Sequence, residues 1–166
     1  MAPSTRTFNS LYGGFNGSER LVHRSKQLLN ILDREQLMPT IVSYGIVLQA
    51  CALASDWEYA FQVKQRLDNT VLKQGPKIFG PLLGLAGMSG DVQRIGAGWQ
   101  WVKDAKCSRS VELYGALMRS LGDCGNVQLA EATLLEMEEE FNLKSNKVSC
   151  PVVPVLVHFY IVLRFT

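Results

Sequence analysis

The sequence is poor in the residues and motifs that build catalytic and cofactor sites. Its only histidines, His23 and His158, lie far apart in the chain. It contains no GxxxxGK[ST] phosphate-binding stretch, no HExxH zinc motif and no GxSxG nucleophile motif. We therefore expect no enzymatic activity, no small-molecule substrate, no metal site and no cofactor.

Paired cysteines are missing as well. The cysteines are widely scattered and none belongs to a CxxC pair, which argues against both a zinc site and a disulfide framework. The pattern indicates buried or free thiols in a reducing compartment. The four positions are Cys51, Cys107, Cys124 and Cys150.

No excess of charge of one sign marks the chain. Its 17 Lys and Arg residues nearly balance 15 Asp and Glu residues, leaving a net charge of +2. This charge is too small to indicate a nucleic-acid-binding protein by electrostatics alone. With 47% hydrophobic and 19% charged residues, the composition is ordinary for a folded protein and argues against wholesale disorder.

The two ends of the chain lack a regular helical pattern. Residues 1–18 include Gly13, Gly14 and Gly17, so we expect an irregular N-terminal segment there. Residues 146–166 are apolar, but two prolines and a histidine interrupt a stretch already shorter than the ~20 residues that a membrane helix needs. We expect an apolar tail or a derailed fourth repeat, and no membrane anchor.

What the sequence does contain is an internal repeat with a period of 35 residues. An aromatic residue, the glycine that follows it, and a later Asp or Asn each recur three times without an insertion or deletion. Such self-similarity is typical of repeat proteins. The recurring positions are Tyr44, Phe79 and Tyr114; Gly45, Gly80 and Gly115; and Asp56, Asp91 and Asn126.

Each copy has the pattern of two helices. Tyr44, Val47 and Leu48 begin an apolar stripe with helical spacing, and the later Asp or Asn is suited to cap a second helix. A single helix pair cannot bury its apolar stripe, so the copies must stack. We therefore predict an all-α solenoid of antiparallel helix pairs, wound as a right-handed superhelix without β-sheet. Its array spans residues 19–145, as a partial repeat 19–40 and repeats 41–75, 76–110 and 111–145.

The aromatic residues have two alternative roles in such an array. The recurring aromatics could stack on nucleic-acid bases, but their register places them on the apolar stripe, so we predict that they pack in the core. The tryptophans fall in the second helices, and we predict that they fill the space between repeats. They are Trp57, Trp99 and Trp101.

The repeat resembles the pentatricopeptide repeat (PPR) family. The resemblance rests on the 35-residue period, on MPTIVSYG leading into the first helix and on GDV with a later alanine at the start of the second. It implies binding of single-stranded RNA, one base per repeat. It also implies work in a mitochondrion or chloroplast on RNA processing, stability or translation, although the N-terminus shows no clear transit peptide.

The resemblance also assigns RNA-binding positions. The base-contacting residues would be Gly45, Gly80 and Gly115; the last residues of the repeats, Gly75, Ser110 and Ser145; and the base-sandwiching residues, Val42, Lys77 and Glu112. Glycine departs from the polar side chain expected at the first of these positions, and Lys77 and Glu112 depart from the family pattern at the third. The glycines either open the groove for a bulky ligand or permit close helix packing.

Two functions follow from these observations. The first is an RNA-binding adaptor of an organelle. The alternative is a protein-binding scaffold that uses the same concave surface without base recognition, which the near-neutral charge, Glu112 and the three glycines favour.

Overall fold

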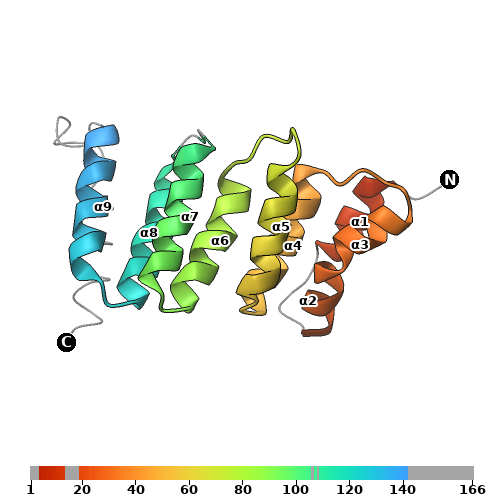
Figure 1. Cartoon of the computed structure of the whole chain (residues 1–166), viewed down its shortest axis with the longest axis horizontal. Helices are drawn as coiled ribbons and strands as arrows, with labels where there is room; N and C mark the ends of the chain where they lie inside the picture. The colour runs from red at the N-terminus through yellow and green to blue at the C-terminus, as the bar shows by residue number, and fades with distance from the viewer. Residues whose placement is uncertain (1–3, 14–18, 106, 108, 142–166) are drawn as a thin grey trace.

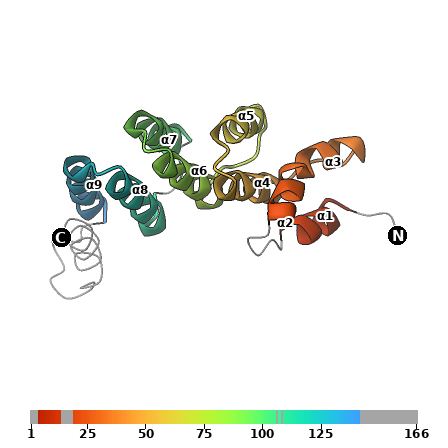
Figure 2. The same ribbon diagram turned by 90° about the horizontal axis from the view of Figure 1, so that it is seen from below.

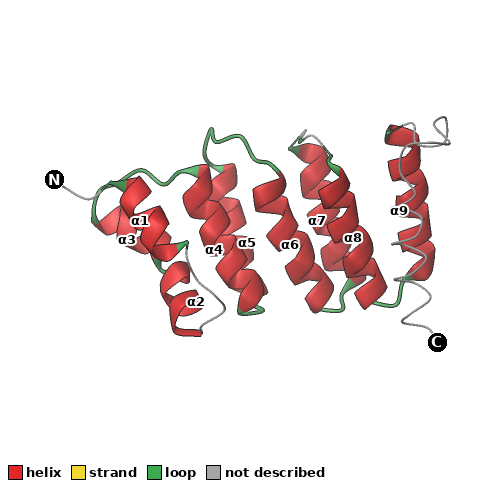
Figure 3. Ribbon diagram, turned by 180° about the vertical axis from the view of Figure 1, so that it is seen from behind, coloured by secondary structure: helices red, strands yellow, loops and turns green. Residues whose placement is uncertain are grey.

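The structure is a computed structural model in which residues 4–13, 19–105, 107 and 109–141 are described. These residues form helices and loops, with no strand among them (Figures 1 and 3). The predicted all-α architecture is therefore confirmed for this part of the chain, whereas the handedness of its winding stays a prediction. The helices are α1 (Thr5–Tyr12), α2 (Glu19–Lys26), α3 (Leu28–Arg34), α4 (Ile41–Leu53), α5 (Trp57–Asp68), α6 (Pro76–Met88), α7 (Val92–Asp104), α8 (Val111–Asp123) and α9 (Val127–Glu140).

The helices are arranged in two layers. Figure 2 shows α4, α6 and α8 in one layer and α3, α5, α7 and α9 in the other. Within the first layer α4 packs against α6, and α6 against α8; each also packs against the helix that follows it, giving the pairs α4–α5, α6–α7 and α8–α9. Each pair is one predicted repeat.

The predicted polar residues begin the second helices. Asp56 Oδ1 accepts a hydrogen bond from the Tyr59 amide at 3.1 Å. Asp91 Oδ1 accepts one from the Gln93 amide at 2.8 Å. Asn126 Oδ1 accepts one from the Leu129 amide at 3.1 Å. The capping prediction is confirmed in all three repeats, and these bonds satisfy amides that the helix itself leaves without partners.

The turn before each cap also repeats. Ser55, Gly90 and Gly125 have φ angles of 53°, 67° and 70°, so the same position of each repeat is left-handed. Glycine adopts this conformation without a steric cost, whereas serine does not. The first repeat therefore carries backbone strain that the other two avoid.

The recurring aromatics lie in the core, as predicted. Tyr44 is 2% exposed, and Phe79 and Tyr114 are fully buried. The tryptophans pack between repeats: Trp99 is buried against Tyr114, while Trp57 of α5 stacks on Trp101 of α7 with ring centroids 6.1 Å apart. Both predictions are confirmed, although Trp57 and Trp101 stay partly exposed.

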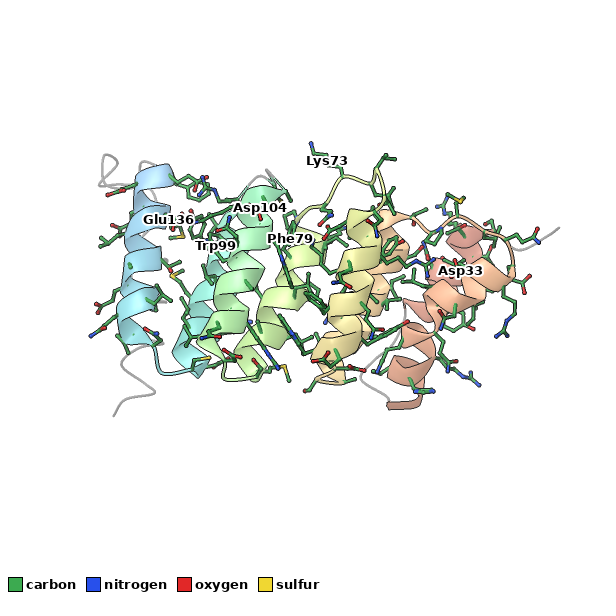
Figure 4. All side chains as sticks on the ribbon, in the orientation of Figure 1. Asp33, Lys73, Phe79, Trp99, Asp104 and Glu136 are labelled. Atoms are coloured by element: carbon green, nitrogen blue, oxygen red, sulfur yellow. The ribbon has the colours of Figure 1, made fainter. Side chains whose placement is uncertain are left out.

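Ion pairs link successive helices of the second layer. Arg66 of α5 holds Asp33 of α3 with two hydrogen bonds of 2.6 and 2.9 Å. Glu136 of α9 lies 3.7 Å from Lys103 of α7 and 3.1 Å from Arg109. Glu136, labelled in Figure 4, is thus paired within the fold.

The N-terminal prediction is wrong for residues 5–12, which form α1 instead of an irregular segment. A capping box explains the helix: Ser4 accepts from the Thr7 amide, and the Thr7 side chain accepts from the Ser4 amide. The helix ends at Tyr12, immediately before the glycine cluster. The N-terminal partial repeat therefore has a first helix, α1, as well as a second.

The second helix of that partial repeat is interrupted at Gln27, between α2 and α3. The Lys26 carbonyl accepts a hydrogen bond of 2.9 Å from the Tyr59 hydroxyl of the next repeat. A tertiary contact thus satisfies this carbonyl at the break. The predicted tail, residues 146–166, lies outside the described residues. Among the helices described, none combines the length and apolar character needed to span a bilayer.

Candidate nucleic-acid interface

The first helices of the three repeats share an exposed stripe on the side opposite their buried residues. We call these stripes together the inner face. It has four rows, each taking one residue from α4, α6 and α8 at intervals of 35 residues. The rows are Val42, Lys77 and Glu112; Gly45, Gly80 and Gly115; Gln49, Gly84 and Arg119; and Leu53, Met88 and Asp123.

The glycine row leaves space in front of the helices. A Cβ atom built on Gly80 or Gly115 would meet no atom within 4 Å, and one on Gly45 would reach only the Lys77 carbonyl oxygen at 3.7 Å and Ile78 Cδ1 at 4.0 Å. Close helix packing therefore does not require glycine at any of the three positions. Of the two explanations that the sequence allowed, the structure supports open space.

Close packing instead occurs at Gly87 of α6. A Cβ atom there would lie 2.6 Å from the Cβ and Oγ of Ser120 on α8. The Ser120 hydroxyl donates a buried hydrogen bond of 2.8 Å to the Leu83 carbonyl. This contact sets how closely the two inner-face helices approach each other, and it lies off the open row.

The first row carries mixed chemistry. Val42 is 50% exposed, so its apolar side chain can contact the face of a nucleic-acid base. Lys77 and Glu112 are exposed, and neither forms an ion pair with another described residue. The Ser110 hydroxyl, hydrogen-bonded to Glu112, lowers the pKa of that carboxyl, so Glu112 keeps a negative charge on the inner face at neutral pH.

The predicted last residues of the repeats lie where the inner-face helices begin. Gly75 precedes α6 and has no side chain. Ser110 precedes α8, and its Oγ accepts a hydrogen bond of 3.4 Å from the Leu113 amide. The Ser110 hydroxyl is therefore engaged at the helix start. Ser145 lies outside the described residues.

Little positive charge gathers on the inner face. Lys77 and Arg119 are its only cationic residues in the rows defined above. Lys73 projects from the loop between α5 and α6, away from the helices (Figure 4), and Lys103 belongs to the other layer, where it faces Glu136. Electrostatic attraction of a phosphate backbone to the inner face would depend on Lys77 and Arg119.

Sequence reasoning missed the third row. Gln49 and Arg119 are exposed on the inner face, and no hydrogen bond or ion pair joins either side chain to the described part of the chain. Their register was visible in the sequence, because they stand four residues after Gly45 and Gly115. What the sequence did not show was that they lie on the open side of the helices.

Comparison with known proteins supports the fold. No protein-family model matches the chain, and the search of curated proteins gives no significant match. Among solved structures, the PPR domain of Arabidopsis thaliana protein-only RNase P 1, in complex with tRNA, is similar with a TM-score of 0.72 and 15% identity. The match covers 95% of this chain and 80% of that chain. The chain has a PPR-like helical-repeat fold, as the 35-residue period predicted.

Proposed function

We propose that the protein binds single-stranded RNA on the inner face and acts as an adaptor, without catalysis, in organellar RNA processing, stability or translation. The observation that carries the proposal is the open glycine row, which leaves equivalent unfilled space on three parallel, regularly stacked helices. Repeats of this fold bind one base each. The bound tRNA of the similar plant domain supports the same class of ligand.

Two of the three residues in the first row favour contact with an RNA strand, and the third opposes it. Val42 offers apolar surface to a base, and Lys77 offers a charge to a phosphate, whereas Glu112 opposes a phosphate at the third repeat. We therefore expect weak RNA binding whose affinity depends little on salt concentration, with Lys77 supplying one phosphate contact. Loss of one contact lowers the salt slope of single-strand binding by roughly 0.7.

A protein-binding scaffold is the second candidate, and one observation favours it. Leu53 and Met88, in the last row, are 50% and 60% exposed. Exposed apolar side chains in register suit the apolar stripe of a partner helix better than they suit a phosphate.

Titration of labelled RNA homopolymers at two salt concentrations tests the proposal. The parent should bind, and Lys77→Glu should weaken binding to every sequence alike because phosphate contacts carry no base information. The control is Arg34→Glu, an equal charge change at the exposed end of α3, in the other layer; it should leave the inner-face contact intact. Negligible binding by the parent would remove RNA and leave the protein-binding scaffold.

A further inference from the structure

The third row of the inner face carries exposed polar side chains at two of its three positions, and neither has a partner among the described residues. Gln49 of α4 and Arg119 of α8 are exposed and make no hydrogen bond or ion pair with the described residues. Gly84 of α6 stands between them, and a Cβ atom there would meet nothing within 4 Å. Along the array, the third row therefore has a polar side chain in the first repeat, no side chain in the second and a polar side chain in the third.

Helix geometry directs these side chains over the glycine row. The Cα–Cβ bonds of an α-helix tilt toward its N-terminus, so a residue covers the surface over the turn before its own Cα. Gln49 stands one turn after Gly45, and Arg119 one turn after Gly115. Each long side chain thus extends toward space that a glycine leaves open. The space over Gly80 receives no such side chain, because Gly84 follows it.

The surroundings of Arg119 indicate which part of RNA it contacts. Glu112 precedes it by seven residues and Asp123 follows by four on the same stripe. Two carboxylates on one helix face repel a phosphate, whereas the uncharged edge of a base is not repelled in this way. A guanidinium forms two hydrogen bonds with guanine O6 and N7, and a glutamine amide pairs in the same manner with adenine N6 and N7.

We propose that Gln49 and Arg119 are the base-selecting residues of this array. The inference rests on the RNA binding proposed above. Because each repeat accommodates one base, the preferred ligand is single-stranded RNA with an adenine and a guanine separated by one nucleotide. That middle nucleotide lies over Gly80 and Gly84, where no side chain distinguishes one base from another.

The test uses fluorescence anisotropy with labelled ten-nucleotide RNAs of uridine. One RNA carries A-U-G at its centre, one carries G-U-A, and one is all uridine, so that both strand directions are covered. The parent should bind A-U-G or G-U-A at least about fivefold more tightly than all-uridine RNA, since one bidentate contact alone gives that discrimination.

Two variants separate base selection from general attraction. Gln49→Ala should lose the preference for adenine and keep that for guanine. Arg119→Lys keeps the positive charge but removes the planar guanidinium that donates two hydrogen bonds to one base. It should therefore lose the preference for guanine while binding all-uridine RNA within about twofold of the parent. Gln65→Ala, an exposed glutamine of α5 in the other layer, is the matched control and should behave as the parent.

A gain-of-function variant completes the test. Gly84→Gln enters open space and replaces a weak helix former with a strong one, so it should fold. It should add a preference for adenine at the middle nucleotide, making A-A-G or G-A-A the tightest ligand. The result expected for Gly84→Gln is a new base preference, so this test does not rely on removing a contact that the parent makes.

The outcomes distinguish this inference from the proposed function. If the parent binds all three RNAs equally, or Arg119→Lys keeps the guanine preference, base selection by this row is overturned while RNA binding stands. If Arg119→Lys instead binds all three RNAs more weakly than the parent by the same factor, Arg119 contributes no base discrimination and the inference fails. If the parent binds no RNA, both the inference and the proposed function fail.

Discussion

Gly87 of α6 and Ser120 of α8 lie so close that a single methyl group on the glycine would come within 2.6 Å of the serine Cβ. Seven residues earlier on the same helix, Gly80 faces open space. One helix therefore carries two glycines with opposite physical roles. Gly87 permits a helix contact, and Gly80 leaves part of the inner face bare.

Alanine substitutions at Gly87 and at Gly84, a second glycine of α6 that faces open space, should accordingly change stability in opposite directions. Gly87→Ala forces α6 and α8 apart and strains a buried hydrogen bond, so it should lower the free energy of unfolding by about 1–3 kcal/mol. Gly84→Ala, on the same helix and also facing open space, should raise it by about 0.5–1 kcal/mol through higher helix propensity. Urea unfolding monitored by circular dichroism measures both. Equal effects of the two changes would contradict this account of the helix contact.

Leu83→Ala should destabilise the whole array. Leu83 is fully buried on α6, and its truncation removes apolar contacts and leaves a cavity, at a cost of about 2–5 kcal/mol. Neighbouring repeats stabilise one another, so we expect loss of helical signal beyond the second repeat in thermal melts. Met88→Ala, at a 60% exposed position of the same helix, is the control. A Leu83→Ala variant that melted with the parent would show that the register assigned to α6 is wrong.

Ser55→Gly should stabilise the protein. Ser55 has a φ of 53°, a conformation that costs a residue with a side chain about 1–2 kcal/mol. Part of the gain is lost because glycine is more flexible when unfolded, so we expect a net increase of about 0.5–1 kcal/mol. The reciprocal change, Gly90→Ser, should introduce the same strain into the second repeat. Stabilisation by both changes would exclude the left-handed turn as the cause.

The stability of the first repeats should depend on acid pH through Asp56. Lys26, which forms a hydrogen-bonded ion pair with Asp56, and secondarily the Tyr59 amide, hold the pKa of this carboxyl below its usual value. A pKa that is lower in the folded state contributes stability above the unfolded pKa of about 3.9, and the contribution is lost as the pH falls through the folded pKa. Unfolding free energy should therefore decrease on acidification in this range.

Asp56→Asn isolates that effect because asparagine retains the ability to cap α5 but does not titrate. The variant should be less stable than the parent at pH 7 and should lose part of the decrease in acid. Lys26→Met removes the partner instead and should produce the same flattening. Parallel stability curves from pH 7 to pH 2 for the parent and Asp56→Asn would contradict a stabilising role for the Lys26–Asp56 pair.

The sequence by itself determined the repeating unit. The 35-residue spacing of Tyr44, Phe79 and Tyr114 was sufficient to predict buried aromatics and paired helices, because helical periodicity and burial are local consequences of residue order. The caps at Asp56, Asp91 and Asn126 were predictable for the same reason: each acts within three residues of its own position.

Tertiary structure alone decided which surfaces are open and which are packed. No local pattern distinguishes Gly80 from Gly87, since the difference is whether a helix of the next repeat lies in front of the glycine. The interruption at Gln27 likewise coincides with a hydrogen bond from Tyr59, a residue of the following repeat. The exposure of Gln49 and Arg119 depends on how three helices stack side by side. Such contacts join residues more than 30 positions apart, and their geometry is set by the packing of whole helices.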